Sequence, residues 1–553
     1  MWRFGMKERM ERGSMEVRVY TRQPRVSDYP PGLAYSVHMA FRTGEEEYKP
    51  WNKNYGILFA EALIRMDDTL DTKALKHPRI YEMEDGSYGI AAVRVQEDGS
   101  EDVDSRGKVL LWKTVDFISF DSMGLVDVSE SGWETSGDCI PVRKEVLERA
   151  AEHWSPVYNT KIRVPECVEL YSREELDQVR AEAVYSDGSC HSKRVVWDKT
   201  GIDFVPGSSY EVTGSIVDQS LPFPVAVGYG DPVVFPWEGK WYYISTNDNT
   251  NDIGLYVREA NSVKGLFQED TVEHLILAED EERQLLQTFW APEFHVIGGE
   301  LYILFAVSGQ VWGPQCHMMR LRKGRSIIEA DSWEDPVRIV RADGSALTQD
   351  GITLDMTYLK TAGSSYVVWS YRRHIGTPLD SGSMLYIATI DEGEPWKLSS
   401  DPVLLTRPLL GWENVAGTIN NEGPYCFTKD GTVYLTYSGG SANSYTYVLG
   451  LLTARAEDDL LSPDSWTKRS TPVLSFYSVE GEYGPGHNSF YVGEEGDLMI
   501  AYHAETALDN TIRCDGIRRV HFRRDGLPEF GMSAKEDLNP SLRQIKTRVI
   551  IKE

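Results

Sequence analysis

The chain has 553 residues, a hydrophobic content of 41% and a formal net charge of −28. This length and apolar content exceed one hydrophobic core, so we expect two to four folded domains and not a disordered chain. So acidic a surface repels phosphate backbones and anionic lipid, which disfavours nucleic-acid and membrane partners and favours neutral ligands.

The six cysteines are scattered along the chain without a Cys-x-x-Cys pair. This spacing argues against a zinc cluster or a disulfide framework and fits a reducing compartment. The charged N-terminal stretch lacks the apolar segment of a signal peptide, and no apolar run reaches the roughly 18 residues of a membrane span. We therefore expect a cytoplasmic protein, and the sequence leaves its oligomeric state open.

Residues 15–135 are expected to form a β-rich region that contains one or two units resembling propeller blades. From His77, the sequence HPRIYEMEDGSYGIAAVRV contains a head residue, a short strand, an Asp-Gly turn and an aromatic second strand. The same order of features recurs five times further along the chain, with an acidic head in four of the five units. Because the head here is a histidine, we interpret this region as blade-like without catalytic residues. A helical periodicity follows over residues 142–154.

Residues 155–218 contain short alternating strands separated by Asp-Gly and Pro-Gly turns, which predicts a small β-sandwich. The pattern YSDGS…VVWD…PGSSYEVTG resembles bacterial immunoglobulin-like domains, which are common in carbohydrate-active and cell-surface proteins. Tyr185, Trp197 and Tyr210 are expected in its core. A spacer role is favoured over sugar binding.

Residues 224–535 contain a fivefold repeat. Each unit has an ionisable head, an apolar strand, a Gly-bearing turn and an aromatic-rich second strand, and successive heads lie 62, 62, 67 and 65 residues apart. Near-constant spacing of short strands is typical of a propeller with one four-stranded unit per blade. We predict an all-β protein with a C-terminal five-bladed propeller. The heads are Asp231, Glu293, Asp355, Glu422 and His487.

A propeller brings the innermost strands of all blades to one axis, so these five distant heads are expected to meet at one end of it. Carboxyl groups gathered so closely cannot ionise independently, and their pKa values are driven apart. The repeat in register therefore favours a functional site over isolated strand caps. Trp369, Tyr437 and Tyr502 lie on second strands and are expected in the blade cores.

The motifs GDPVVF, WAPEFH, NNEGPY and GPGHNSF, in this order and spacing, resemble glycoside hydrolase family 43 over about residues 224–531. The resemblance implies a five-bladed propeller that hydrolyses arabinofuranosides and xylosides. It places Asp231 at the general base, Glu422 at the general acid and Asp355 at a third carboxylate that orients the acid and tunes its pKa.

Four neighbours complete the expected site. Trp290 is a candidate for stacking on a sugar ring, with blade packing as the alternative, and Glu293 is a substrate-binding candidate or a framework residue. The resemblance places Arg513 in the pocket, with Arg518 as its rival. It implies no required cofactor. A structural calcium ion at the axis is left open, with His487 as the residue that would meet it or its water shell; otherwise we expect no metal site.

The expected function is therefore an inverting hydrolase that releases terminal pentosyl units from small oligosaccharides, most directly an α-L-arabinofuranosidase. A β-D-xylosidase or a bifunctional enzyme is the alternative within this class. A non-catalytic carbohydrate-binding propeller is the alternative of another class, disfavoured because all three acids are present. A phosphorylase or transferase on a related scaffold is disfavoured because the heads offer no basic phosphate pocket.

Overall fold

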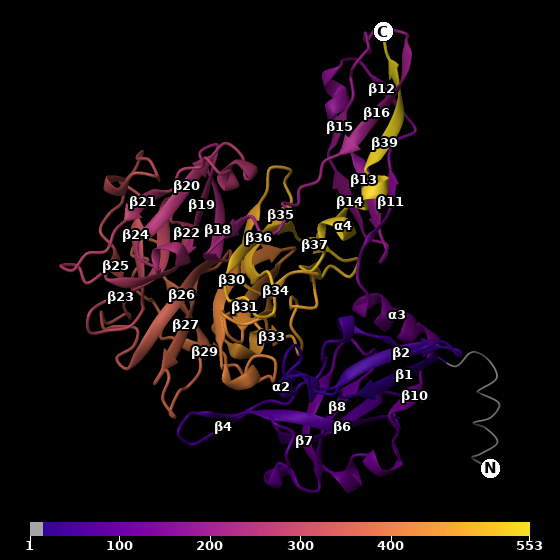
Figure 1. The fold of residues 1–553 in the computed structure, drawn as a ribbon, viewed down its shortest axis with the longest axis vertical. Helices are drawn as coiled ribbons and strands as arrows, with labels where there is room; N and C mark the ends of the chain where they lie inside the picture. Colours follow the sequence, from indigo (N-terminus) through magenta and orange to yellow (C-terminus); the bar gives the residue numbers. More distant parts are fainter. Residues whose placement is uncertain (1–14) are drawn as a thin grey trace. The chain divides into compact units, whose positions relative to one another are not determined.

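The computed structural model describes residues 15–553, and strands dominate its regular structure (Figure 1). Two compact units are present. Among the described residues, the first combines residues 15–155, 226–490 and 501–515, and the second combines residues 156–225, 491–500 and 516–553. The N-terminal stretch used to argue against a signal peptide lies mostly outside the described residues. Within residues 15–553, no helix has the length and apolar character needed to cross a bilayer.

Five four-stranded antiparallel sheets form the predicted propeller (Figure 1). The first blade is β18 (Tyr229–Trp237), β19 (Lys240–Asn247), β20 (Leu255–Ala260) and β21 (His274–Leu277). The second is β22 (Gln287–Ile297), β23 (Glu300–Ser308), β24 (Gln315–Arg320) and β25 (Val337–Arg338). The third is β26 (Gly351–Lys360), β27 (Ser365–Arg373), β28 (Met384–Ile390) and β29 (Val403–Thr406). The fourth is β30 (Asn421–Lys429), β31 (Thr432–Gly439), β32 (Val448–Arg455) and β33 (Thr467–Lys468).

The fifth blade closes the ring with a strand from the other end of the domain. Its order is β17 (Ala226–Val227), β36 (Cys514–Arg519), β35 (Leu498–Glu505) and β34 (Tyr483–Val492). Ala226 pairs with Asp515 in this sheet. The inner strands contact one another in sequence, β18 with β22, β22 with β26 and β26 with β30. The Ser489 hydroxyl donates to the carbonyl of Pro232 at 2.6 Å and joins the last inner strand to the first.

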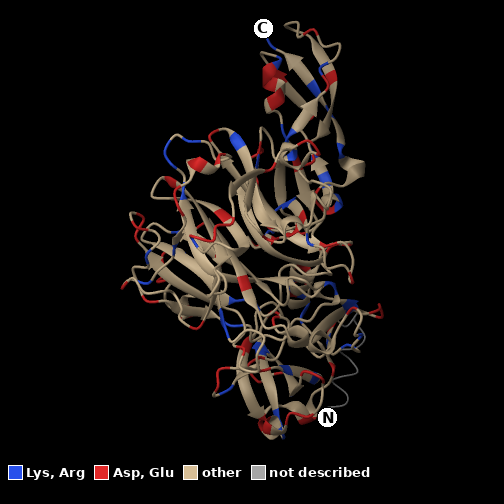
Figure 2. Ribbon diagram, turned by 60° about the vertical axis from the view of Figure 1, so that its left-hand side comes forward, with Lys and Arg blue, Asp and Glu red and all other residues tan. Residues whose placement is uncertain are grey.

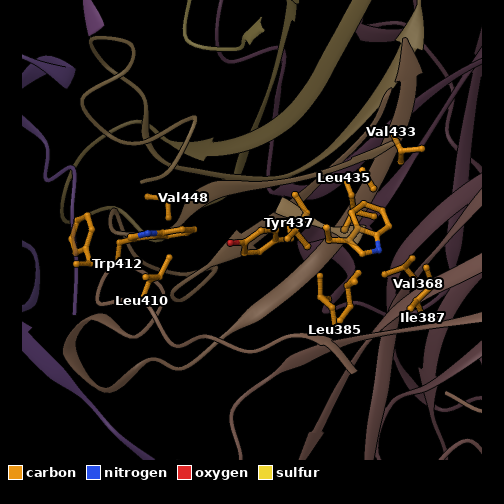
Figure 3. Close-up of a cluster of buried hydrophobic side chains, with 14 of the residues drawn as sticks. Val368, Leu385, Ile387, Leu410, Trp412, Val433, Leu435, Tyr437 and Val448 are labelled. Carbon is orange, nitrogen blue, oxygen red and sulfur yellow. The ribbon is translucent and has the colours of Figure 1, made fainter. Parts of the chain in front are cut away.

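Apolar residues fill the spaces between blades. Figure 3 shows Val368, Leu385 and Ile387 of the third blade beside Val433, Leu435 and Tyr437 of the fourth. Because each blade has a neighbour on both faces, its central strands carry apolar residues at successive positions and not only at alternate ones. Trp369, Tyr437 and Tyr502 are 2%, 0% and 1% exposed, as expected for core residues.

Two four-stranded sheets precede the propeller in the first unit. One has the order β10 (Cys139–Pro141), β1 (Met15–Tyr20), β2 (His38–Thr43) and β3 (Lys49–Pro50), and the other has the order β6 (Lys73–Glu82), β7 (Tyr88–Gln96), β8 (Lys108–Thr114) and β9 (Asp121–Asp127). They share a core that includes Trp51 and receives α3 (Lys144–Trp154), the helix predicted from periodicity. The second sheet is the blade-like unit expected around His77. A short hairpin, β4 (Leu63–Ile64) with β5 (Leu70–Asp71), lies between the sheets in sequence.

The second unit is built on two sheets around a common core. One consists of β11 (Asn159–Arg163), β13 (Ala181–Tyr185) and β14 (Cys190–Lys193). The other has the order β12 (Cys167–Leu170), β39 (Gln544–Ile551), β16 (Ser209–Ile216) and β15 (Val195–Trp197). The strand β39 lies far outside the range 155–218 expected for this sandwich, because strand patterns do not reveal which distant segment completes a sheet. The immunoglobulin-like assignment and the domain boundaries stay predictions.

Charged residues are interspersed in both units (Figure 2). Acidic and basic residues are coloured along loops and strands alike, so the charges that sum to −28 over the sequence are not gathered in one segment. Interspersed charge of both signs leaves the choice of ligand to local sites. The absence of nucleic-acid and membrane partners stays a prediction, and the oligomeric state stays open.

Candidate active site

β-bulges interrupt the inner strands β18, β22, β26 and β30, and a left-handed residue lies near the start of the inner strand in all five blades. Asp231, Asp355 and His487 have left-handed backbones, with φ of 58°, 54° and 40°. In β22 and β30 the left-handed residues are Ala291 and Gly423, with φ of 45° and 56°. Such φ values are uncommon outside glycine, and bulges redirect side chains next to functional sites. These left-handed residues occupy equivalent positions in the five inner strands, so the blades can be aligned on them.

The bulges bring five of the seven predicted site residues, together with Arg513, to one cavity of about 560 Å³. The cavity is polar, because most of its lining side chains carry carboxyl, amide or guanidinium groups. Predicted residues that line it are Asp231, Trp290, Asp355, Glu422, His487 and Arg513. A concave site with convergent polar groups is the usual form of a small-ligand pocket.

Asp231 is held ionised by its surroundings. It is 6% exposed, and its carboxylate accepts hydrogen bonds from Thr246 Oγ1 at 2.5 Å and from Arg513 at 3.1 Å. Burial alone would raise the pKa of this carboxyl. The charges of His487 and Arg513 outweigh burial and hold the pKa of Asp231 well below its usual range.

Glu422 has the opposite shift. Burial, followed by the charge of Asp355, raises the pKa of Glu422 to about 7, although the hydroxyl of Tyr447 donates to Oε1 at 3.0 Å and lowers it. Asp355 Oδ2 accepts hydrogen bonds from Ser370 Oγ and from the Gly423 backbone N–H, both at 3.1 Å. Burial also raises the pKa of Asp355. One cavity thus contains an ionised carboxylate and a carboxyl that holds its proton near neutral pH.

Arg513 is the arginine that reaches the cavity. Its guanidinium donates to Asp231 Oδ1 at 3.1 Å and to both oxygens of Asp248, at 2.5 and 3.0 Å. The motif glycine Gly230 makes room for it, since a Cβ there would lie 2.2 Å from Arg513 Cζ. Arg518, the rival from the sequence, does not line the cavity.

His487 lies between the carboxyl groups. Its Nδ1 is 3.1 Å from Asp231 Oδ1, and its backbone N–H donates to Ser438 Oγ at 2.7 Å. Burial would lower the pKa of His487, but the surrounding carboxylates, Asp231 first, raise it. The imidazole therefore contributes positive charge at the centre of the acidic cluster.

Glu293 does not reach the cavity, contrary to its prediction as a substrate-binding residue. It follows its bulge residue, Ala291, by two positions, and a strand advances about 3.3 Å per residue. Its side chain therefore lies deeper along the inner strand, where it is 2% exposed and bonded to His295 Nε2 at 2.6 Å. The spacing of the repeat placed Glu293 in line with the other acids. The spacing does not show where the bulge lies relative to each acid, and in β22 the acid follows the bulge residue by two positions.

Several lining residues were not predicted. One of them is Asp252, whose Oδ2 accepts the indole N–H of Trp290 at 2.9 Å. This hydrogen bond fixes the ring that the sequence suggested for stacking. Asn420 is the first residue of the NNEGPY motif, and Asp248 follows β19, the strand paired with that of Asp231, so closeness to the predicted acids was an available signal. The remaining lining residues not predicted are Asn251, Gln287, Leu354, Ser441, Ala442 and Asn443.

His503 and Tyr447 connect the two carboxyls with opposite shifts. The Asp231 backbone N–H donates to His503 Nδ1 at 3.2 Å, and the His503 ring is stacked on Tyr447 with centroids 5.5 Å apart and planes 6° apart. Burial lowers the pKa of His503 to about 4, so the ring is neutral at pH 7. Nδ1 also lies 3.3 Å from Asp231 Oδ1, so this nitrogen faces both the backbone N–H and the carboxylate of Asp231.

Within residues 15–553, no group of three or more His, Cys, Asp or Glu side chains is arranged to hold a metal ion. The six cysteines are free. Catalysis by two carboxyl groups requires no cofactor. The question of a structural calcium ion at the axis stays open.

A family model for glycosyl hydrolases family 43 matches residues 223–528, more than half of the chain. The chain belongs to this family. Membership confirms the resemblance read from the motifs and agrees with the predicted all-β propeller. It also implies a carbohydrate substrate.

Curated relatives are similar over about half of the chain. An extracellular exo-α-(1→5)-L-arabinofuranosidase from Streptomyces avermitilis is 31% identical over 57% of this chain and 64% of its own length. An enzyme of the same name from Streptomyces chartreusis is 30% identical over 48% of this chain and 76% of its own length. The crystal structure of an α-L-arabinofuranosidase from Lactobacillus brevis is 27% identical over 56% of this chain and 95% of its own, with a TM-score of 0.48. The chain thus spans less than two thirds of the S. avermitilis relative.

The cytoplasmic location expected from the sequence is contradicted by these relatives. Both Streptomyces enzymes are named extracellular. The expectation rested on scattered cysteines and a charged N-terminal stretch. Neither determines the compartment, because extracellular proteins with large apolar cores do not depend on disulfides for stability.

Proposed function

We propose that the protein is an inverting, exo-acting α-L-arabinofuranosidase that releases terminal arabinofuranosyl units from arabinose-containing oligosaccharides. The observation that carries the proposal is the opposite pKa shift of Asp231 and Glu422 within one cavity. Glycosidases need one ionised and one protonated carboxyl on either side of the scissile bond. The names of the curated relatives favour the arabinofuranoside among the family's pentosides.

In the proposed reaction Asp231 removes a proton from a water molecule, whose oxygen attacks the anomeric carbon. Glu422 gives its proton to the leaving glycosidic oxygen as the bond breaks. One proton thus leaves Glu422 and one arrives at Asp231, and exchange with solvent restores both. Attack from the face opposite the leaving group inverts the anomeric configuration.

The other residues have supporting roles in this proposal. Asp355 keeps Glu422 protonated through its negative charge, while Arg513 and His487 keep Asp231 ionised. The indole of Trp290 presents an electron-rich face to the C–H groups of a sugar ring. Amide and carboxylate groups at the cavity wall, such as Asn420 and Asp248, bind hydroxyls.

The proposal is tested by comparing wild type with Glu422→Gln on two substrates, a nitrophenyl α-L-arabinofuranoside and an arabino-oligosaccharide. Loss of the general acid is expected to lower kcat/KM on the oligosaccharide by about 10²- to 10⁴-fold. The loss on the nitrophenyl substrate is smaller, because nitrophenolate leaves without protonation. Glu457→Gln, an exposed glutamate in the same propeller, serves as the control and retains wild-type activity.

Proton NMR of the first turnovers reports the anomer released. Initial release of the retained anomer contradicts the role of Asp231 in activating water. Turnover of a nitrophenyl β-D-xyloside but not of the arabinofuranoside shifts the substrate to xylosides. Binding without turnover on any pentoside favours the non-catalytic propeller.

A further inference from the structure

The third blade carries a second cavity, of about 470 Å³, which we call the blade 3 cavity. It is formed where the segment preceding β26 crosses one face of β27 and β28, and where the β4–β5 hairpin approaches that face. The residues used below to describe it are Asp68, Arg341, Asp350, Tyr371, Arg373 and Tyr386. None of them lines the cavity that contains Asp231, Asp355 and Glu422, which we call the catalytic cavity after its proposed role.

The floor of the blade 3 cavity is aromatic and held in place. Tyr386 is stacked on the buried Trp369, with centroids 6.1 Å apart and planes 25° apart, and Tyr371 meets Tyr386 edge-on at 5.6 Å. The Tyr371 hydroxyl donates to Asp350 Oδ1 at 2.9 Å, which fixes the second ring. A fixed aromatic surface binds the C–H face of a sugar at low entropic cost, because no loose side chain has to be ordered.

Polar groups around this floor are available to a ligand. The Tyr386 hydroxyl makes no hydrogen bond within residues 15–553, and Tyr386 is partly exposed. Arg341 uses only its Nε, which donates to the Leu347 carbonyl at 3.2 Å. Its terminal nitrogens therefore remain free, within the described chain, to donate to hydroxyl or ring oxygens.

The charge of the blade 3 cavity favours a neutral ligand. Asp68 accepts from Arg407 at 2.6 Å and also from Arg373, so the Arg373 guanidinium is already paired. Asp343 and Asp350 also line the cavity, and carboxylates outnumber guanidinium groups there. An anionic ligand is therefore repelled, whereas a polyhydroxylated sugar finds an aromatic face with donors and acceptors.

The two cavities open along the same inner strand of the third blade. Asp350, directly before β26, lines the blade 3 cavity, and Leu354 lines the catalytic cavity. Four residues of strand span about 13 Å. On β27, Arg373 faces the blade 3 cavity, while its neighbour Arg372 donates to Asn420 of the catalytic cavity at 2.8 Å. A glycan with its terminal unit in one cavity is thus close to the other.

We propose that the blade 3 cavity is a second carbohydrate-binding site, which holds a neutral glycan chain near the catalytic cavity. The assignment of the glycan as arabinose-containing rests on the proposed function; the site itself does not. Binding at two nearby positions raises the effective concentration of a long substrate at the catalytic cavity. A substrate with a single sugar unit gains nothing.

The test is native electrophoresis through gels that contain arabinan or xylan. The Glu422→Gln protein is compared with two double variants, in which it also carries Tyr386→Ala or Arg341→Ala. We expect retardation by at least one polysaccharide and a reduction of the apparent affinity by about tenfold in each variant. Tyr256→Ala is the matched control, since Tyr256 occupies the third strand of the first blade as Tyr386 does in the third. Arg341→Ala provides an independent test if Tyr386→Ala does not fold. Thermal melting shows whether each variant is folded.

Kinetics on the active protein provide the second readout. Tyr386→Ala is expected to lower kcat/KM on arabinan about tenfold and to leave kcat/KM on the nitrophenyl arabinofuranoside within twofold. No retardation by either polysaccharide, equal retardation of all variants, or an equal loss on both substrates overturns the second site. Absence of turnover on every pentoside rejects the proposed function and leaves the electrophoretic result to decide the second site alone.

Discussion

Neighbouring groups give the carboxyls of the catalytic cavity different charges. Asp231 lies against Arg513 and His487, whereas Glu422 lies against Asp355 and a tyrosine hydroxyl. The motifs are distinctive enough to predict Asp231, Asp355 and Glu422 from the amino-acid sequence. Tyr447 and His503 were not predicted, because they lie on segments whose sequence reads as ordinary core.

The pKa of Glu422, about 7, sets the upper limit of the pH range for activity. In its proposed role of general acid Glu422 must be protonated, so kcat/KM is expected to fall as pH rises above about 7. Asp355→Asn removes a charge that raises this pKa and moves the fall to lower pH. Tyr447→Phe removes a hydrogen bond that lowers the pKa and moves it to higher pH. Rate profiles of the two variants check the signs, and shifts in the same direction contradict the assignment.

His503 is expected to position Asp231 through its Nδ1. The buried Nε2 of His503 has no partner among the described residues, and an unpaired buried polar atom costs roughly 1–3 kcal/mol, so packing alone does not explain this histidine. His503→Phe keeps a ring against Tyr447 but loses the acceptor for the Asp231 N–H, and we expect kcat to fall about tenfold with little change in KM. His503→Asn restores an acceptor at the Nδ1 position and regains part of kcat. Equal kcat in the two variants assigns His503 to packing.

At the scale of elements, the repeat predicted five blades because apolar strands and Gly-bearing turns recur in the sequence. The closing strand β17 escaped notice, since two residues, Ala226 and Val227, carry no periodic signal. The sequence pattern also did not predict the bulges, and for that reason it did not predict that Glu293 lies further along its strand than the other acids. Pairing partners and register depend on contacts between segments far apart in the chain, which local patterns do not encode.

Gly228 is expected to be critical for closing the ring. Its φ is +77°, its N–H donates to the Arg513 carbonyl at 2.9 Å, and a Cβ there would lie 2.3 Å from Asn249 Oδ1. Gly239, in the β18–β19 turn, has φ of +82° and open space around it. Gly239→Ala therefore costs only the backbone strain, roughly 1–2 kcal/mol. Gly228→Ala adds a clash and is expected to lower Tm further and to reduce activity; equal Tm values for the two variants contradict this role.

At the scale of the whole molecule, the second unit depends on a strand from the far end of the described chain. β39 pairs with β12 in parallel and with β16 in antiparallel register, and Val549 and Ile551 are buried in the shared core. Length and composition predicted several domains, but no local pattern indicated that one of them is assembled from separate segments.

Removal of residues 544–553 is expected to unfold the second unit, because it deletes a central strand and opens two unpaired edges. Limited proteolysis should then cleave within residues 156–225. Removal of Glu553 alone, which lies beyond β39, is the control and leaves the cleavage pattern unchanged. Resistance of residues 156–225 in the longer truncation contradicts a central role for β39.

The pairing of β17 with β36 also has a consequence during protein synthesis. Val227 leaves the ribosome before its partner Cys514 by roughly 15 to 60 seconds, at a translation rate of about 5–20 residues per second. Throughout that interval the propeller in the nascent chain lacks β36, and β17 has an unpaired edge. Chaperones that shield such edges are therefore expected to matter more for the yield of this protein in cells than for its stability once released.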